Sequence, residues 1–186
     1  KTGMLFNTAI IREVAGFFHT LRGPKPPLIV DPVMVATSGA RLLKPAALRA
    51  LQSELLPLAT LVTPNLDEAQ ILVGAKLRSL DDLRAAARAI HARFGCAALV
   101  KGGHLRGARD AVDVFFDGKQ ELLLTAPFVR GVATHGTGCT YSAAIAAHCA
   151  RGHDLAKSVR FAKKFITRAI ADSYRIGPHS ALNPLA

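Results

Sequence analysis

The stretch HGTGC at residues 135–139 places two glycines, a hydroxyl and a single thiol at the expected start of a helix. The first backbone N–H groups of a helix have no intrahelical partners, and the helix dipole adds about half a positive charge there. Gly136 and Gly138 carry no side chain that would keep a phosphate away, so the stretch predicts an anion site. The same field should lower the pKa of the Cys139 thiol. A thiolate there could accept a proton from a hydroxyl that attacks a γ-phosphoryl group.

Other interpretations of this stretch stay open. It could be a glycine turn followed by a small buried cysteine, which is a common use of that residue. It could also belong to a cysteine hydrolase that pairs Cys139 with His135, although nothing fixes a catalytic triad. Thr140 and Tyr141 follow the cysteine, so the stretch is not a GxxxxGK[ST] loop.

Further polar side chains follow apolar, β-rich runs. Asp31 ends PPLIVD and Lys101 ends ALVK, and open α/β sheets hold their ligands at the carboxyl edge of such strands. Asp31 could touch a phosphate-bound metal, but it could also be a turn aspartate before proline, and Lys101 could be an unpaired surface lysine. Asn65 and Glu68, in NLDE, suit a helix N-cap with an acid in the first turn.

The elements that must position these residues alternate between β-rich runs and segments of helical period, which predicts a mostly parallel sheet covered by helices. Strands are expected at residues 2–6, 26–31, 60–63 and 96–103, and on both sides of an Asp117–Gly118 hairpin turn. Helices are expected at residues 8–22, 44–59, 66–74, after an N-cap at Ser79, at 137–151 and at 154–174. Neither a linker nor a repeat is visible, so we expect a single domain over residues 1–186.

Composition narrows the class of protein. The 186 residues are 50% apolar and carry a formal net charge of +11. The cations are dispersed on amphipathic helices without a nucleic-acid-binding motif, so we expect no nucleic-acid partner; the excess charge suits an anionic substrate. No apolar run is long enough for a membrane span, and three cysteines without CxxC spacing favour the cytoplasm. The cations of the last long helix are expected to be solvated: Lys157, Arg160, Lys163, Lys164 and Arg168.

Five motifs stand in order along the chain. They are GML at 3–5, DPVMVATSGARLL at 31–43, LLPLATLVTPNLDEAQILVG at 55–74, LVKGGHL at 99–105 and THGTGCTYSAAIAAHCARG at 134–152. Together they resemble the phosphomethylpyrimidine kinases of thiamine biosynthesis, members of the ribokinase-like superfamily. The resemblance implies a three-layer α/β/α sandwich with a mostly parallel central sheet and an antiparallel hairpin at its edge. It also implies transfer of the ATP γ-phosphoryl group to hydroxymethylpyrimidine and then to its monophosphate, in an enzyme that is typically a homodimer.

The resemblance also implies roles for individual residues. Gly136, Thr137 and Gly138 would form the anion hole, and Cys139 would stand beside the substrate where related sugar kinases place an aspartate base. The nucleotide cofactor would be bound by Asp31, Asn65, Lys101 and Thr134. Of these, Lys101 would contact phosphate and Asp31 a phosphate-bound metal. Asn65 and Glu68 would lie near Mg²⁺, through water, as suits a strongly hydrated ion. Met4 and Val33 would line the pyrimidine pocket, with core filling as the alternative for both.

The sequence departs from the family pattern at its start. Residue 1 is Lys rather than Met, the first element begins in mid-pattern, and the family's glycine-rich N-terminal segment is not seen, so we expect a piece to be missing upstream. Two alternatives to the pyrimidine kinase follow. One is a pyridoxal or pyridoxine kinase, since some relatives accept both ring systems, and the other is a non-catalytic fragment that binds nucleotide.

Overall fold

The computed structural model describes residues 1–35, 42–103, 105, 110–129, 132, 136–177 and 179–185. The helices are α1 (Thr8–Thr20), α2 (Pro45–Ala50), the π-helical turn η1 (Leu51–Leu55), the 3₁₀ turn η2 (Leu56–Leu58), α3 (Leu66–Val73), α4 (Leu80–Phe94), α5 (Thr137–Ala150) and α6 (Leu155–Ala171). The strands are β1 (Ile29–Val30), β2 (Leu61–Val62), β3 (Ala97–Lys101), β4 (Asp110–Phe116), β5 (Glu121–Pro127), β6 (Tyr174–Ile176) and β7 (His179–Ala181).

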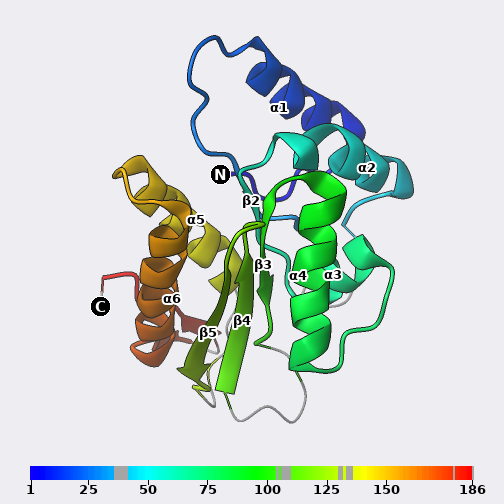
Figure 1. Ribbon diagram of the computed structural model, residues 1–186. Helices are drawn as coiled ribbons and strands as arrows, with labels where there is room; N and C mark the ends of the chain where they lie inside the picture. The colour runs from blue at the N-terminus through cyan, green and yellow to red at the C-terminus, as the bar shows by residue number, and fades with distance from the viewer. Residues whose placement is uncertain are drawn as a thin grey trace.

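The central sheet has the strand order β1-β2-β3-β4-β5 (Figure 1). The neighbours β1, β2 and β3 are parallel, whereas β4 runs antiparallel to both β3 and β5. The turn between β4 and β5 is the expected hairpin, in which Asp117 accepts hydrogen bonds from the backbone of Lys119 and Gln120. Strands β6 and β7 form a separate antiparallel pair.

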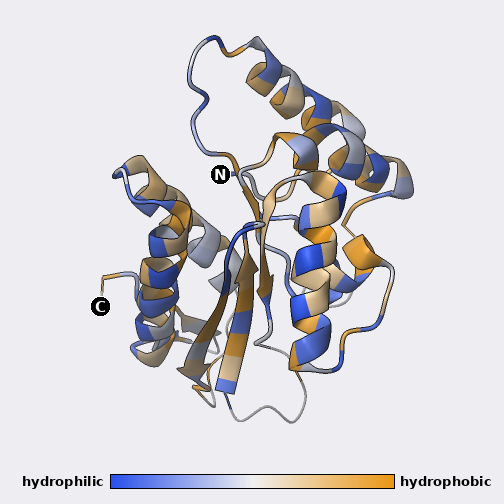
Figure 2. Ribbon diagram, viewed as in Figure 1, coloured by the Kyte–Doolittle hydropathy of each residue, from blue (hydrophilic) through white to orange (hydrophobic). Residues whose placement is uncertain are grey.

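Helices cover both faces of this sheet, which gives three layers. Successive side chains of a strand point to opposite faces, so along β3 Ala97 and Leu99 join one apolar cluster while Ala98 and Val100 join the other. Helices α5 and α6 complete the cluster that contains Leu99. The cluster that contains Val100 is completed by α1, α2, η1, α3 and α4, and the two groups of helices lie on the two sides of the sheet in Figure 1. The middle of the sheet is mostly apolar, whereas α4 and α6 carry polar and apolar colours side by side (Figure 2). The expected α/β/α sandwich is confirmed.

Local chemistry explains where several helices begin. Asn65 accepts a hydrogen bond from the backbone N–H of Glu68 while the Glu68 carboxylate accepts one from the backbone of Asn65, a reciprocal capping box. Ser79 and Asp82 form a second capping box at the start of α4. These two N-terminal boundaries were expected from the sequence and are confirmed.

Two expected elements differ from the structure. Residues 2–6 do not form a strand; only Thr2 makes an isolated parallel bridge to Val30. The helix expected over residues 44–59 widens into η1 and then tightens into η2. Pro57 lies in η2 and has no backbone N–H to continue an α-helical ladder, which accounts for the end of the helix there.

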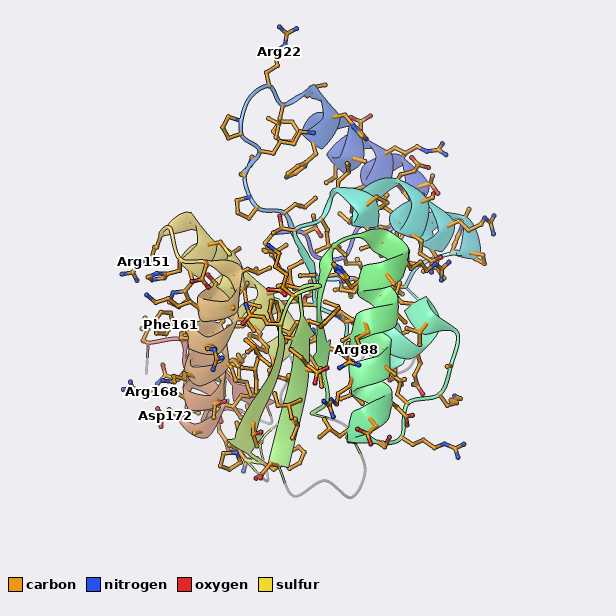
Figure 3. All side chains as sticks on the ribbon, viewed as in Figure 1. Arg22, Arg88, Arg151, Phe161, Arg168 and Asp172 are labelled. Atoms are coloured by element: carbon orange, nitrogen blue, oxygen red, sulfur yellow. The ribbon has the colours of Figure 1, made fainter. Side chains whose placement is uncertain are left out.

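The cations of α6 divide between solvent and core. Arg168 lies on the outer side of the α5–α6 layer with its partner Asp172, 3.8 Å away (Figure 3). Lys163, which we expected to be solvated, is instead buried, and it forms a 2.8 Å ion pair with Asp113 of β4.

Among the described helices, none combines the length and apolar character needed to cross a lipid bilayer.

Candidate active site

The candidate residues meet at the carboxyl edge of the three parallel strands. Asp31 follows β1, Asn65 follows β2 and Lys101 ends β3. An isolated parallel bridge joins Asn65 to Lys101, and Thr2 bridges to Val30 just before Asp31. This is the edge at which open α/β sheets bind ligands, so the topology gathers the predicted polar side chains at a site suited to a ligand.

Asp31 is the centre of the polar cluster. Its side chain is almost wholly buried, and its two carboxylate oxygens lie 3.3 Å from the Lys101 ammonium and 3.3 Å from the Ser142 hydroxyl, which donate to it. Lys1 lies 3.9 Å from the same carboxylate. The alternative that Lys101 is an unpaired surface lysine is therefore wrong.

The N-terminus of α5 lies next to this polar cluster. Gly136 caps the helix with φ of 82°, a left-handed conformation that glycine adopts without strain. A Cβ placed on Gly138 would lie 2.9 Å from the Lys101 ammonium nitrogen. Glycine at this position therefore lets a lysine charge stand directly against the first turn of the helix. A helix N-terminus with an adjacent ammonium group is suited to an anion such as a phosphate.

Cys139 lies in the first turn of α5, beside this charged cluster, with part of its surface open to solvent and part covered. The predicted decrease in its pKa is wrong. Partial burial raises the pKa of the thiol above its ordinary value of 9.0, and the negative charge of Asp31 raises it further, against the opposing charges of Lys1 and Lys101. The thiol is therefore mostly protonated at neutral pH.

Ser142 is a site residue that the sequence analysis missed. Its side chain is fully buried, and its hydroxyl lies within 3.3 Å of the Asp31 carboxylate and 3.0 Å of the carbonyl oxygens of Gly138 and Cys139. It ties the first turn of α5 to the end of β1. Its position four residues after Gly138, hence on the same helix face, is the signal that could have identified it.

Glu68 is buried behind this edge of the sheet. Its carboxylate accepts hydrogen bonds from the backbone N–H groups of Asn65, at 2.8 Å, and Met34, at 3.4 Å. The N-cap interpretation of Asn65 and Glu68 is therefore confirmed, while their role near a metal stays a prediction. Burial raises the pKa of Glu68 from 4.5 to about 7, more than the Lys101 charge and the backbone hydrogen bonds lower it.

This raised pKa predicts a pH-dependent stability. Between pH 4.5 and about 7 the folded state holds a proton on Glu68 that the unfolded state has lost, so the free energy of unfolding should fall as pH rises across this interval. The expected contribution is about 3 kcal/mol. We expect Glu68→Gln to remove it, as measured by urea unfolding at pH 5 and pH 8. Asp67→Asn, at the exposed neighbouring acid, is the control, and an unchanged pH slope in Glu68→Gln would contradict the assignment.

The remaining predicted residues are less closely tied to the cluster. Val33 is half-buried two residues beyond Asp31, and Met4 is exposed two residues beyond Thr2, so both follow the same edge of the sheet. Thr134 and His135 lie outside the residues that the structure describes. Within the described part of the chain, no three His, Cys, Asp or Glu side chains gather as a metal site.

Comparison with known proteins relates this geometry to a family. The family profile described as phosphomethylpyrimidine kinase matches residues 1–184. A hydroxymethylpyrimidine/phosphomethylpyrimidine kinase of Streptomyces coelicolor is 44% identical over 177 residues, which are 95% of this chain and 64% of the relative. The thiamine biosynthesis bifunctional protein ThiED of Geobacter sulfurreducens is 42% identical over 95% of this chain and 36% of its own length.

Solved structures agree with the sequence relatives. The pyridoxal kinase from Staphylococcus aureus in complex with AMP-PCP and pyridoxal superposes with a TM-score of 0.88 and 32% identity, over 98% of this chain and 65% of that chain. Phosphomethylpyrimidine kinase from Clostridium difficile gives a TM-score of 0.73 and 35% identity, over 88% and 64%. The chain thus spans somewhat less than two thirds of the length of these single-function kinases and about a third of the bifunctional protein. Since the family profile extends over nearly every residue, the chain belongs to the phosphomethylpyrimidine kinase family.

Proposed function

We propose that this chain is the ATP-dependent phosphotransferase part of a kinase that phosphorylates hydroxymethylpyrimidine and its monophosphate in thiamine biosynthesis. The names of its sequence relatives support this substrate class. The observation that carries the proposal is the Lys101 ammonium, held by Asp31 at 3.3 Å and placed where a side chain on Gly138 would otherwise stand. A buried acid that orients a lysine toward a helix N-terminus suits the triphosphate of a nucleotide.

The residues of the site would have separate roles in phosphoryl transfer. The backbone N–H groups of Gly136, Thr137 and Gly138 would stabilise the charge that develops on the transferred group, together with Lys101. Cys139, as thiolate, would take the proton of the substrate hydroxyl while that oxygen bonds to the γ-phosphorus. The bond from the γ-phosphorus to the bridging oxygen then breaks, and ADP leaves with the bridging oxygen.

The residues present also suit a magnesium ion. Asp31 and Glu68 supply hard carboxylate oxygens at the same edge of the sheet, where Glu68 accepts a hydrogen bond from the backbone N–H of Met34, three residues beyond Asp31. Mg²⁺ keeps several waters and takes one or two carboxylates together with substrate phosphates, so Asp31, Asn65 and Glu68 would hold it largely through water. The ion would neutralise charge on the nucleotide phosphates.

Two alternatives differ from this proposal in substrate or in chemistry. The first alternative is a pyridoxal kinase, and its support is the likeness to solved pyridoxal kinase structures at TM-scores of 0.85 to 0.88. A nucleotide-binding chain without catalysis is the other, because the Asp31–Lys101 pair and the start of α5 suit the phosphates of a nucleotide whether or not a pyrimidine binds.

Nucleotide binding is the first test. We expect calorimetric titration of the chain with ATP and Mg²⁺ to give saturable 1:1 binding, and Lys101→Met to weaken it about 10- to 100-fold through loss of a charged hydrogen bond. Lys119→Met, at an exposed lysine of the β4–β5 turn, is the matched control. Absence of ATP binding, or equal losses in both variants, would contradict the assignment of Lys101.

Substrate choice is measured in the same preparation. Steady-state phosphorylation of hydroxymethylpyrimidine is compared with that of pyridoxal, on this chain and on a chain extended by the N-terminal part of the Streptomyces coelicolor relative. A higher kcat/KM for hydroxymethylpyrimidine supports the proposal, and a higher one for pyridoxal supports the first alternative. ATP binding without turnover on either chain supports the second.

We further propose a homodimer in the cytoplasm. Large apolar side chains of the N-terminal segment and α1 are exposed to solvent, and a second copy would cover them: Phe6, Ile10 and Phe17. The three cysteines are free thiols, as is usual in a reducing compartment.

A further inference from the structure

A buried ion pair lies behind the site and has no part in the chemistry described so far. Asp113 of β4 and Lys163 of α6 are both buried, and the Lys163 ammonium donates to the Asp113 carboxylate at 2.8 Å and to the carbonyl of Ala111 at 3.2 Å. Removing two charges from water is costly, and such a pair often adds little to stability compared with apolar residues of similar size. The burial of this pair therefore points to a role other than stability.

The second oxygen of Asp113 reaches the site. It accepts a 3.1 Å hydrogen bond from the backbone N–H of Gly102, the residue directly after Lys101. In the β3–β4 register, Lys101 itself lies opposite Asp113. The corner at Gly102 is tightly packed, because a Cβ there would overlap the Val112 carbonyl oxygen and the Leu83 side chain. One carboxylate therefore joins the corner after Lys101 to helix α6.

Asp113 also lies near helix α5. Tyr141, two residues beyond Cys139, is buried, and its pKa is raised by burial and then by the Asp113 charge. The carboxylate thus stands between the end of β3, the first turns of α5 and the middle of α6. Of these elements, β3 carries Lys101 and α5 carries Gly138, and their relative placement brings the Lys101 ammonium to Gly138.

We propose that Asp113 and Lys163 are positioning residues: Asp113 fixes the Lys101–Gly102 corner through the Gly102 N–H, and Lys163 offsets the charge of the Asp113 carboxylate so that this acceptor can stay buried. The inference rests on the proposed function, since it assigns the pair to the nucleotide site. A pair that serves only to stabilise the fold would affect nucleotide binding independently of Lys101, so the two roles make different predictions.

Two double variants separate the hydrogen bond from the charges. Asp113→Asn with Lys163→Met removes both charges and keeps an acceptor for Gly102, whereas Asp113→Leu with Lys163→Met removes the acceptor as well. We expect ADP affinity, measured by calorimetry, to stay within about 2-fold in the first and to fall about 10-fold in the second. Exchange of the Gly102 amide hydrogen should accelerate only in the second. Circular dichroism and thermal unfolding verify the fold of each.

A double-mutant cycle with Lys101→Met measures whether the two changes in ADP affinity are coupled. A purely structural role of the pair would give no such coupling. If the pair acts through Lys101, the Asp113→Leu/Lys163→Met change should cost little further ADP affinity in the Lys101→Met background. Equal losses in both backgrounds would overturn the inference. A 10-fold loss of ADP affinity in the folded Asp113→Asn/Lys163→Met variant would also overturn it. This second outcome can be measured even if the leucine variant fails to fold. Absence of ADP binding by the unsubstituted chain would overturn the proposed function and this inference together, whereas binding without coupling overturns the inference alone.

Discussion

Gly138→Val is expected to lower the rate of phosphoryl transfer by about 10²- to 10³-fold, the range for loss of one group that stabilises developing charge. An added Cβ would lie 2.9 Å from the Lys101 ammonium, so this flexible end of the side chain must move away from Gly138, which disturbs its 3.3 Å pair with Asp31. The branched side chain also occupies the approach to the helix N-terminus. Because the clash falls on the tip of a lysine rather than on backbone, the fold should persist while ATP binding weakens.

The measurements are steady-state kinetics, calorimetric titration with ATP and thermal unfolding. Gly16→Val is the matched control, since Gly16 is an exposed glycine of α1, and apart from its chain neighbours and the adjacent helix backbone no described atom lies within 4 Å of a Cβ placed there. A Gly138→Val protein with near-normal turnover and ATP affinity would refute the anion site at the start of α5.

Cys139→Ala is expected to lower kcat by about 10²- to 10⁴-fold with little change in ATP affinity, because proton acceptance contributes to the transition state and not to nucleotide binding. The direction of the pKa shift adds a pH signature. Since the thiol pKa is raised above 9.0, the thiolate fraction and hence kcat should grow as pH rises from 7 to 9. In Cys139→Ala this rise should disappear.

Cys139→Asp provides a second test, because it replaces the proposed base with another base where Cys139→Ala removes it. An aspartate is ionised throughout this range, so the variant should keep measurable turnover and lose the alkaline increase. Cys149→Ala, at a half-buried cysteine of the same helix, is the control and should keep the pH profile of the unsubstituted protein. A Cys139→Ala protein whose ATP affinity falls as much as its kcat would show that the cysteine is structural.

Local sequence signals predicted the parts of this fold that depend on near neighbours. Asn65 and Ser79 were expected as N-caps because their partners lie three residues away, and the structure confirms both capping boxes. The carboxyl-edge placement of Asp31 and Lys101 followed from the alternation of strands and helices. Pro57 was visible in the sequence as a helix breaker, and the helix expected through it was extended too far.

Features that depend on distant partners could not be predicted in this way. The expected decrease in the pKa of Cys139 considered the helix dipole alone and omitted Asp31, which lies more than a hundred residues earlier in the chain. Lys163 was expected in solvent because its helix is amphipathic, and its partner Asp113 lies 50 residues away. Burial and a distant charge raised the pKa of Cys139, and a distant carboxylate holds Lys163 in the core; periodicity carries no information about either partner.

The contact between Asp31 and Ser142 also bears on how the protein is made. The two residues are 111 positions apart, and Asp31 and Lys101 are 70 apart. At ribosomal rates of about 5 to 20 residues per second, roughly 5 to 20 seconds separate the synthesis of Asp31 from that of Ser142. During this interval the Asp31 carboxylate has neither its serine partner nor the first turn of α5 beside it. Closing so long a loop is slow compared with forming capped helices, so affinity for nucleotide should be acquired last, after the layers around the sheet have assembled.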